Sequence, residues 1–176
     1  EKDSGTCKSA SSPNTAQKKP RIIMIVITSS VATKAKPPVI WNRWIDVGSW
    51  RQWNTSLDYA RLAAGFRIGA HGELCMNKDK KAAFVITRIE PDKMFEMKSC
   101  AWGNDVLFRY VIETIGGMQR MLVEVEVTGY TSWIFGTWFG FVMKKELPAA
   151  LTRLAFLVED DQERVERELH SAQFKK

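Results

Sequence analysis

PPVIWNRWIDVGSWRQW occupies residues 37–53, and four of the seven tryptophans of the chain fall within it. Three explanations compete for so much aromatic surface in one short stretch. It would serve as a stacking surface for nucleic acid, as a membrane-facing belt, or as short helices that close one end of a hydrophobic interior. The segments on either side favour the third explanation, because a strand pattern precedes the stretch and a series of short strand patterns follows it.

Two short helices are expected inside this stretch. Pro38 suits the first turn of a helix, where its missing N–H is not needed, and Trp41 and Trp44 follow at helical spacing. We expect Gly48 to end this helix and Ser49 to cap a second one, which carries the remaining two tryptophans. The tryptophans would then cover one end of the fold.

The segments around this stretch have strand patterns. Residues 22–33 are rich in β-branched side chains and end before Pro37 and Pro38, which would interrupt strand pairing. Short strands separated by turn residues follow at 57–62, 69–76, 82–90, 94–102, 106–114 and 120–130. This regular series predicts an antiparallel meander.

Alternation within the last two strands indicates which side chains face the interior. In the segment MLVEVEV the apolar residues, Val123 and Val125 among them, occupy one face and the two glutamates occupy the other. In the segment VLFRYVIE, Phe108 and Tyr110 belong to the more apolar set, which we take as the inner face. Each strand would therefore place one face on a core or cavity and the other in water.

The hydrophobic period becomes helical over residues 133–170. Apolar side chains recur every three or four positions from Phe135, Phe139 and Met143 onward, with one gap near the acidic residues that follow. Pro148 lacks a backbone donor, so we expect it to kink this helix or to restart it. The chain would end in a long helix.

The order of these elements is that of a helix-grip arrangement. The stretch PPVIWNRWIDVGSWRQWN closely resembles the opening motif of the START-like (SRPBCC) superfamily, in its polyketide cyclase/dehydrase branch. FVITRIEPDKMFEM (84–97) resembles the central hairpin of that superfamily, and LPAALTRL (147–154) resembles its terminal helix. The resemblance covers residues 22–158 and implies an α+β fold, in which a curved seven-stranded antiparallel sheet wraps around a long C-terminal helix.

The resemblance also implies a deep cavity between sheet and helix that holds an apolar molecule, such as a lipid, a sterol, a polyketide or a terpenoid. Some relatives are transfer proteins, some are ligand sensors, and some are cyclases or dehydratases. No catalytic motif is common to all of them, so no catalytic residue is carried over. The side chains expected to line the ligand are Trp41, Trp44, Tyr59, Phe84, Phe95, Met97, Phe108, Tyr110, Val123, Val125, Phe135, Phe139 and Met143.

A cofactor-free cyclase, dehydratase, isomerase or pericyclic catalyst is the alternative function, and it would need an acid or base inside the pocket. His71 and Glu73 share one face of an expected strand and form a weak catalytic pair, which is simply solvated if the opposite face is buried. Tyr110 is a further weak catalytic candidate, because its hydroxyl would orient a carbonyl group. The remaining ionisable candidates are Asp58, Tyr59 and Arg88.

The charge of the chain does not indicate a specific nucleic-acid-binding protein. The net charge is +6, and much of the excess lies at the two ends of the chain. A basic tail attracts polyanions weakly and in a salt-sensitive way, but it does not read bases. A third function class, a surface module with transient membrane contact, would use residues 133–143 together with Lys144 and Lys145.

The cysteines and histidines do not indicate a metal centre. Cys7, Cys75 and Cys100 lack metal-ligand spacing, and the chain has only two histidines. We therefore expect no metal and no cofactor. We also expect Cys75 and Cys100 to remain unbridged, because the strand order that the resemblance implies places one strand between theirs.

Residues 1–20 contain almost nothing that could be buried, and we expect a disordered arm there, followed by one domain over residues 21–172. No apolar run approaches the roughly 20 residues that span a bilayer. A soluble protein is expected, with the cytoplasm slightly favoured, although a targeting segment could already have been removed ahead of Glu1. Nothing in the sequence indicates the oligomeric state.

Overall fold

A computed structural model describes residues 23–76, 80–101, 104–129 and 132–173. The chain forms one strand, two short helices, six further strands and one long helix, as expected. The elements are β1 (Ile23–Thr33), α1 (Pro37–Ile45), the 3-10 helix η1 (Val47–Gln52), β2 (Leu57–Leu62), β3 (His71–Met76), β4 (Lys80–Glu90), β5 (Met94–Ala101), β6 (Asn104–Ile115), β7 (Met118–Gly129) and α2 (Ser132–Gln173).

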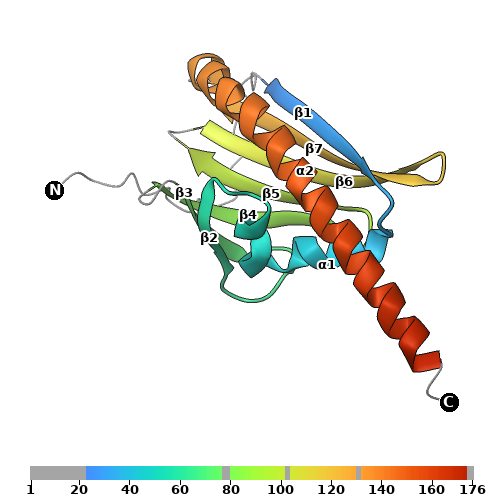
Figure 1. The fold of residues 1–176 in the computed structure, drawn as a ribbon. Helices are drawn as coiled ribbons and strands as arrows, with labels where there is room; N and C mark the ends of the chain where they lie inside the picture. Colours follow the sequence, from blue (N-terminus) through green and yellow to red (C-terminus); the bar gives the residue numbers. More distant parts are fainter. Residues whose placement is uncertain (1–22, 77–79, 102–103, 130–131, 174–176) are drawn as a thin grey trace.

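The strands form one seven-stranded antiparallel sheet in the order β1-β7-β6-β5-β4-β3-β2. Strands β2 to β7 are sequential neighbours, and β1 pairs with β7 at the opposite edge. Gly116 and Gly117, with φ of 58° and 84°, form the tight turn between β6 and β7. In Figure 1 the sheet curves behind α2, which crosses it diagonally, while α1 and η1 lie at one end. This is the helix-grip fold.

A single residue, Asp46, separates the two short helices. The prolines begin α1, as expected. The boundary at Gly48 and the cap at Ser49 were wrong: α1 ends at Ile45, the backbone leaves the helical region at Asp46 (ψ 76°), and both residues lie inside η1. The indole N–H of Trp50 donates to the carbonyl of Trp44 at 2.9 Å, which satisfies a carbonyl at the end of α1.

Alternate residues of the central strands form a buried inner face. In β7, Met121, Val123, Val125 and Val127 are completely buried, and the intervening residues are partly exposed. Their partners on β6 include Tyr110, opposite Val123. The alternation expected for these strands is thus confirmed. Four side chains of α2 complete the core above this face: Leu147, Leu151, Leu154 and Val158.

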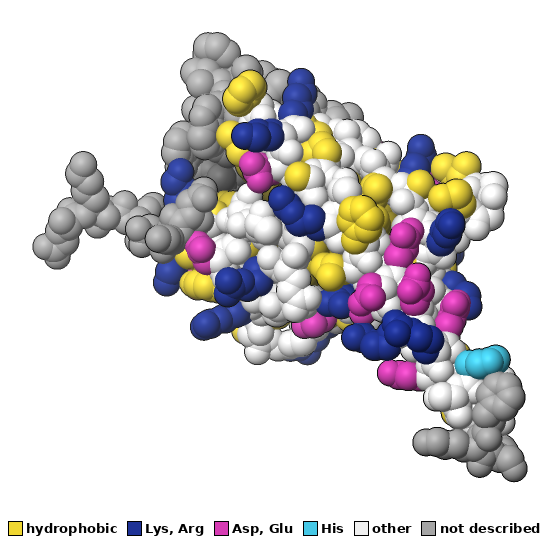
Figure 2. Space-filling model, viewed as in Figure 1, with side chains coloured by type: hydrophobic (Ala, Val, Ile, Leu, Met, Phe, Trp, Pro, Cys, Tyr) yellow, Lys and Arg dark blue, Asp and Glu magenta, His cyan; other side chains and the backbone are white. Residues whose placement is uncertain are grey.

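Helix α2 runs without interruption through Pro148 to Gln173, so the expectation of a restarted helix was wrong. The hydroxyl of Thr152 donates to the carbonyl of Pro148 at 2.9 Å, one turn along. Beyond Gln162 the side chains are exposed, and this end of the helix extends past the sheet (Figure 1). Lysines, arginines, aspartates and glutamates gather on that extension in Figure 2.

Candidate functional site

Four tryptophans close one end of the inner face, and we call them the tryptophan roof: Trp41, Trp44, Trp50 and Trp53. Their exposed fractions are 8% or less. Beneath them, Phe95 of β5 and Tyr110 of β6 are paired across neighbouring strands and stack with ring centres 4.5 Å apart and planes at 4°. The ring of Trp44 meets both edge-on, at 5.6 Å and 5.7 Å. The roof and the sheet therefore form one aromatic cluster.

The indole nitrogens of the roof differ in their hydrogen bonding. Trp50 donates to the carbonyl of Trp44. The indole nitrogens of Trp44 and Trp53 are buried, and among the residues that the structure describes neither has an acceptor. Trp44 is completely buried and Trp53 is 2% exposed. Buried donors without an acceptor are rare in native proteins and call for an explanation such as a bound water or ligand.

Tyr110 is the one ionisable candidate that the structure places among these rings. Its side chain is 4% exposed. Desolvation by burial raises the pKa of its hydroxyl well above the ordinary value of 10. The phenol therefore stays protonated at neutral pH, so its chemistry is that of a hydrogen-bond donor and not that of a base.

A set of partly exposed apolar side chains adjoins the buried cluster, and we call it the apolar margin: Phe108, Phe139 and Met143. Phe108 belongs to the inner face of β6, where its neighbours across the ladder, Met97 and Val125, are both buried. Its ring meets that of Phe139 of α2 edge-on, with centres 6.4 Å apart. The margin thus joins the middle of the inner face to the first half of α2, and solvent reaches it.

His71 and Glu73 are exposed and lie on the outer face of the sheet. Leu74, between Glu73 and Cys75, packs into the core. This is the arrangement in which the pair is simply solvated. Arg88 is exposed and forms an ion pair with Glu90. Asp58 is exposed as well, and its carboxylate lies 3.9 Å from the Cys75 sulfur.

Tyr59 was expected among the lining residues, but it lies on the outer face. Its hydroxyl donates to the carboxylate of Glu73, which raises the pKa of the phenol. The guanidinium of Arg61 lies 4.7 Å from the centre of its ring. The physical reason is a bulge: the register between β2 and β3 shifts between Leu57 and Tyr59, so Ala60 is buried in place of Tyr59.

The other expected lining residues lie together on the inner side. Phe84 stacks on Trp50 with ring centres 5.9 Å apart. Those inside the fold or on its margin are Trp41, Trp44, Phe84, Phe95, Met97, Phe108, Tyr110, Val123, Val125, Phe139 and Met143. Phe135 lies outside the residues whose side chains are described.

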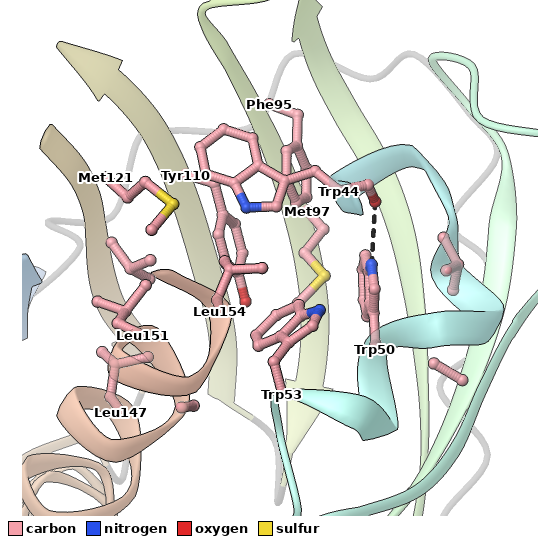
Figure 3. Close-up of a cluster of buried hydrophobic side chains, with 14 of the residues drawn as sticks. Trp44, Trp50, Trp53, Phe95, Met97, Tyr110, Met121, Leu147, Leu151 and Leu154 are labelled. Atoms are coloured by element: carbon pink, nitrogen blue, oxygen red, sulfur yellow. Dashed lines mark hydrogen bonds between the residues drawn. The ribbon is translucent and has the colours of Figure 1, made fainter. Parts of the chain in front are cut away.

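Sequence reasoning missed two groups that adjoin this site. Trp50 and Trp53 were not among the side chains expected to line the ligand, yet in Figure 3 Trp53 lies between Trp50 and Leu154 of α2. Leu151 and Leu154 were not among the expected lining residues either; both are buried, and in Figure 3 Leu154 lies beside Tyr110 while Leu151 lies on the side of Met121. The helical apolar stripe was the signal that could have identified the two leucines.

Further expectations concern the described chain as a whole. Strand β4 lies between β3 and β5, so the strand order separates Cys75 from Cys100 as expected, and no disulfide joins them. The described segments contain no group of three or more metal-ligating side chains. Within the same segments, no helix has both the length and the apolar character to cross a bilayer. Phe141 is 79% exposed beside Lys144 and Lys145, and membrane contact there stays a prediction.

The chain is similar to solved structures in its fold, but no similarity to a known protein is found from its sequence. No protein-family model and no curated protein matches the sequence. Norcoclaurine synthase from Thalictrum flavum, solved with dopamine and hydroxybenzaldehyde, superposes with a TM-score of 0.63 at 8% identity, over 85% of this chain and 98% of that one. Ara h 8.0201 superposes with a TM-score of 0.62 at 9% identity, over 78% of this chain and 99% of that one.

A third solved structure is the di-domain ARO/CYC protein StfQ from the steffimycin biosynthetic pathway, with a TM-score of 0.65 at 6% identity. The match covers 80% of this chain and 51% of that one, so this chain corresponds to about half of StfQ. Superpositions with sequence identities this low establish the fold and nothing finer. Together with the strand order and the long C-terminal helix, they show that this chain has the START-like helix-grip fold.

Proposed function

We propose that this chain binds an apolar small molecule between the tryptophan roof, the inner face of the sheet and α2. The observation that carries the proposal is the separation of side chains by chemistry. His71, Glu73 and Arg88 lie outside, whereas large aromatic and flexible methionine side chains line the inside. Sites for apolar ligands have this composition, with few polar groups among many apolar ones.

The apolar margin supports access to that interior. Phe108 is partly exposed although it sits on the inner face between buried neighbours. Phe139 and Met143 of α2 are partly exposed beside it. Partly exposed apolar side chains that adjoin a buried aromatic cluster fit an entrance better than a finished core, where such side chains are shielded. We place the entrance between the first half of α2 and β6.

The structural neighbours are consistent with this proposal. Norcoclaurine synthase was solved with two small aromatic molecules, dopamine and hydroxybenzaldehyde, on the same fold. StfQ is described as an ARO/CYC protein of a biosynthetic pathway. A lipid, polyketide or terpenoid ligand suits this interior equally by its apolar character, and the choice among these classes depends on the size of the molecule.

The alternative is a cofactor-free cyclase, dehydratase or pericyclic enzyme that uses the same interior. Among the described ionisable candidates only Tyr110 lies inside, and its raised pKa keeps it protonated. Proton abstraction by a side chain therefore has no candidate base there. A catalyst built on this interior would act by folding the substrate into a reactive shape. Binding alone requires no acid or base among the residues of the interior, so it is the function we propose.

A matched pair of phenylalanine variants tests the binding site. Phe139→Ala removes a ring of the margin, and Phe156→Ala removes a ring from the same helix that is 69% exposed. We expect Phe139→Ala to weaken binding of a fluorescent apolar probe by about tenfold, since a ring that the bound probe covers contributes more than about 1 kcal/mol. Phe156→Ala, and Glu124→Ala on the outer face, should bind as the wild type does. Equal affinities for all variants would show that the apolar margin is not part of the binding site.

A further inference from the structure

Two hydrogen-bond donors in the interior lack an acceptor among the described residues. The indole N–H groups of Trp44 and Trp53 are buried, and the described residues provide no acceptor for either. Leaving such a donor unsatisfied costs the full desolvation of the group. A phenylalanine would have filled much of the same volume without that cost, so the nitrogens point to a partner that is not part of the described protein.

The position of these nitrogens connects them with the proposed interior rather than with the surface. Trp44 contacts Tyr110 edge-on, and Trp53 contacts Trp50 at 6.1 Å between ring centres. In the view of Figure 3 the nitrogen of Trp44 and the hydroxyl of Tyr110 lie beside Leu154 of α2, and the nitrogen of Trp53 lies beside the sulfur of Met97, on the side of its ring that faces Trp50. Trp50, whose nitrogen is already bonded to a carbonyl, lies on the far side of Trp53.

These groups have the same chemical preference. An indole N–H only donates, and a phenol that stays protonated has its proton to give. We infer that the interior selects an apolar ligand that carries hydrogen-bond acceptors, such as a carbonyl, phenol or ether oxygen, and that the indoles of Trp44 and Trp53 donate to those oxygens. This inference rests on the proposed binding function and narrows its ligand class to apolar molecules that carry oxygen acceptors, as opposed to plain hydrocarbon chains.

The test uses two probes of the same shape. 2-Acetylnaphthalene carries a carbonyl oxygen where 2-isopropenylnaphthalene carries a methylene group. Removing an indole donor should weaken only the carbonyl probe. We expect Trp44→Phe, Trp53→Phe or both to raise the Kd of 2-acetylnaphthalene by about three- to tenfold, the value of one hydrogen bond. The Kd of 2-isopropenylnaphthalene should change less than twofold.

Trp50→Phe is the matched control, because its indole N–H already donates to the Trp44 carbonyl. This variant should lose stability without any preference between the two probes. Since a tryptophan variant can fail to fold, a second measurement uses the wild-type protein. Both probes shift the indole ¹⁵N–¹H resonances of Trp44 and Trp53 through the ring current of the naphthalene, so the comparison is between the two complexes: a resonance whose indole donates should lie further downfield with 2-acetylnaphthalene than with 2-isopropenylnaphthalene.

The outcomes separate the inference from the proposed function. If both probes bind and neither the variants nor the indole resonances distinguish them, the indoles hold a trapped water only; the inference is then overturned while apolar binding stands. If neither probe binds the wild-type protein, the proposed function fails as well. A selective loss of the carbonyl probe in Trp44→Phe or Trp53→Phe, or a selective downfield shift, supports the inference.

Discussion

Gly72 on β3 lies between Leu62 of β2 and Phe84 of β4 in the ladder. A Cβ atom at this position would come within 2.3 Å of the Phe84 ring and 2.6 Å of the Arg61 carbonyl oxygen. Contacts this short do not occur between real atoms, and the carbonyl belongs to the backbone, which shifts less readily than a side-chain end. The absent side chain at Gly72 therefore lets Phe84 lie flat under Trp50, with the two ring planes at 26°.

Gly72→Ala should accordingly lower the free energy of unfolding by about 1–3 kcal/mol, the usual cost of overpacking a core. Gly48→Ala is the control, because the nearest atom to an added Cβ there is the Asp46 carboxylate at 3.6 Å, an ordinary contact. Urea unfolding of both variants measures the difference. An unchanged midpoint for Gly72→Ala would show that the β2–β3 edge yields more easily than its contacts indicate.

At the residue scale, alternation was a reliable guide where the strands are regular. Val123 and Val125 face inward as expected, because β6 and β7 pair without a break. Tyr59 was misplaced because β2 and β3 contain a bulge, which changes the face of every later residue in the strand. Period-two reasoning cannot detect an extra residue of this kind. The missing hydrogen-bond acceptors of the Trp44 and Trp53 nitrogens could not be predicted either, because a sequence does not show which groups lie near an indole N–H.

Helix α2 is tied to the short helices by a charged contact. The guanidinium of Arg43 on α1 donates two hydrogen bonds to the carboxylate of Asp161, which is 8% exposed, and a third to Gln52 of η1. Arg164 donates to the same carboxylate at 2.7 Å. Bonding to Asp161 also raises the pKa of the Arg43 guanidinium. One buried carboxylate thus joins the three helices beside the roof.

Asp161→Asn should destabilise the protein by about 1–3 kcal/mol, because it removes the charge from a largely buried, two-pronged hydrogen bond. Asp160→Asn, at an exposed neighbouring position, is expected to change the unfolding free energy by less than about 0.5 kcal/mol. Urea denaturation followed by circular dichroism compares the two. The contact would lose its structural role if both variants unfolded at the same urea concentration.

At the element scale, the existence and type of each element were predictable, and the junctions were not. The helix was expected to stop at Gly48 because glycine breaks helices, but the Trp50 indole satisfies a carbonyl at the end of α1 and the chain turns at Asp46 instead. The helix was expected to kink or to restart at Pro148; it does not restart, because packing of Leu147 and Leu151 into the core continues across the proline. Tertiary contacts decided both boundaries, and local propensity does not include them.

At the scale of the whole molecule, the element order and the likeness to solved structures agree on the helix-grip fold. This order was readable from the sequence because each strand is short, apolar on alternate residues and followed by turn residues. For the candidate site, the sequence predicted only which faces of the strands and of the long helix point inward. Its two distinguishing features, the apolar margin and the unsatisfied indoles, depend on how α2 and the roof meet the sheet, which requires the structure.

The central claim is that an apolar ligand binds between the roof, the inner face and α2. A ¹³C-methyl methionine NMR titration of the wild-type protein with 2-acetylnaphthalene tests it most directly. Met97 is buried on the inner face, Met143 lies on the margin, and Met118 is 43% exposed at the β6–β7 turn. We predict saturable shifts of the Met97 and Met143 methyl signals with Met118 unchanged. Saturable binding that moves Met118 and leaves Met97 and Met143 in place would contradict the account.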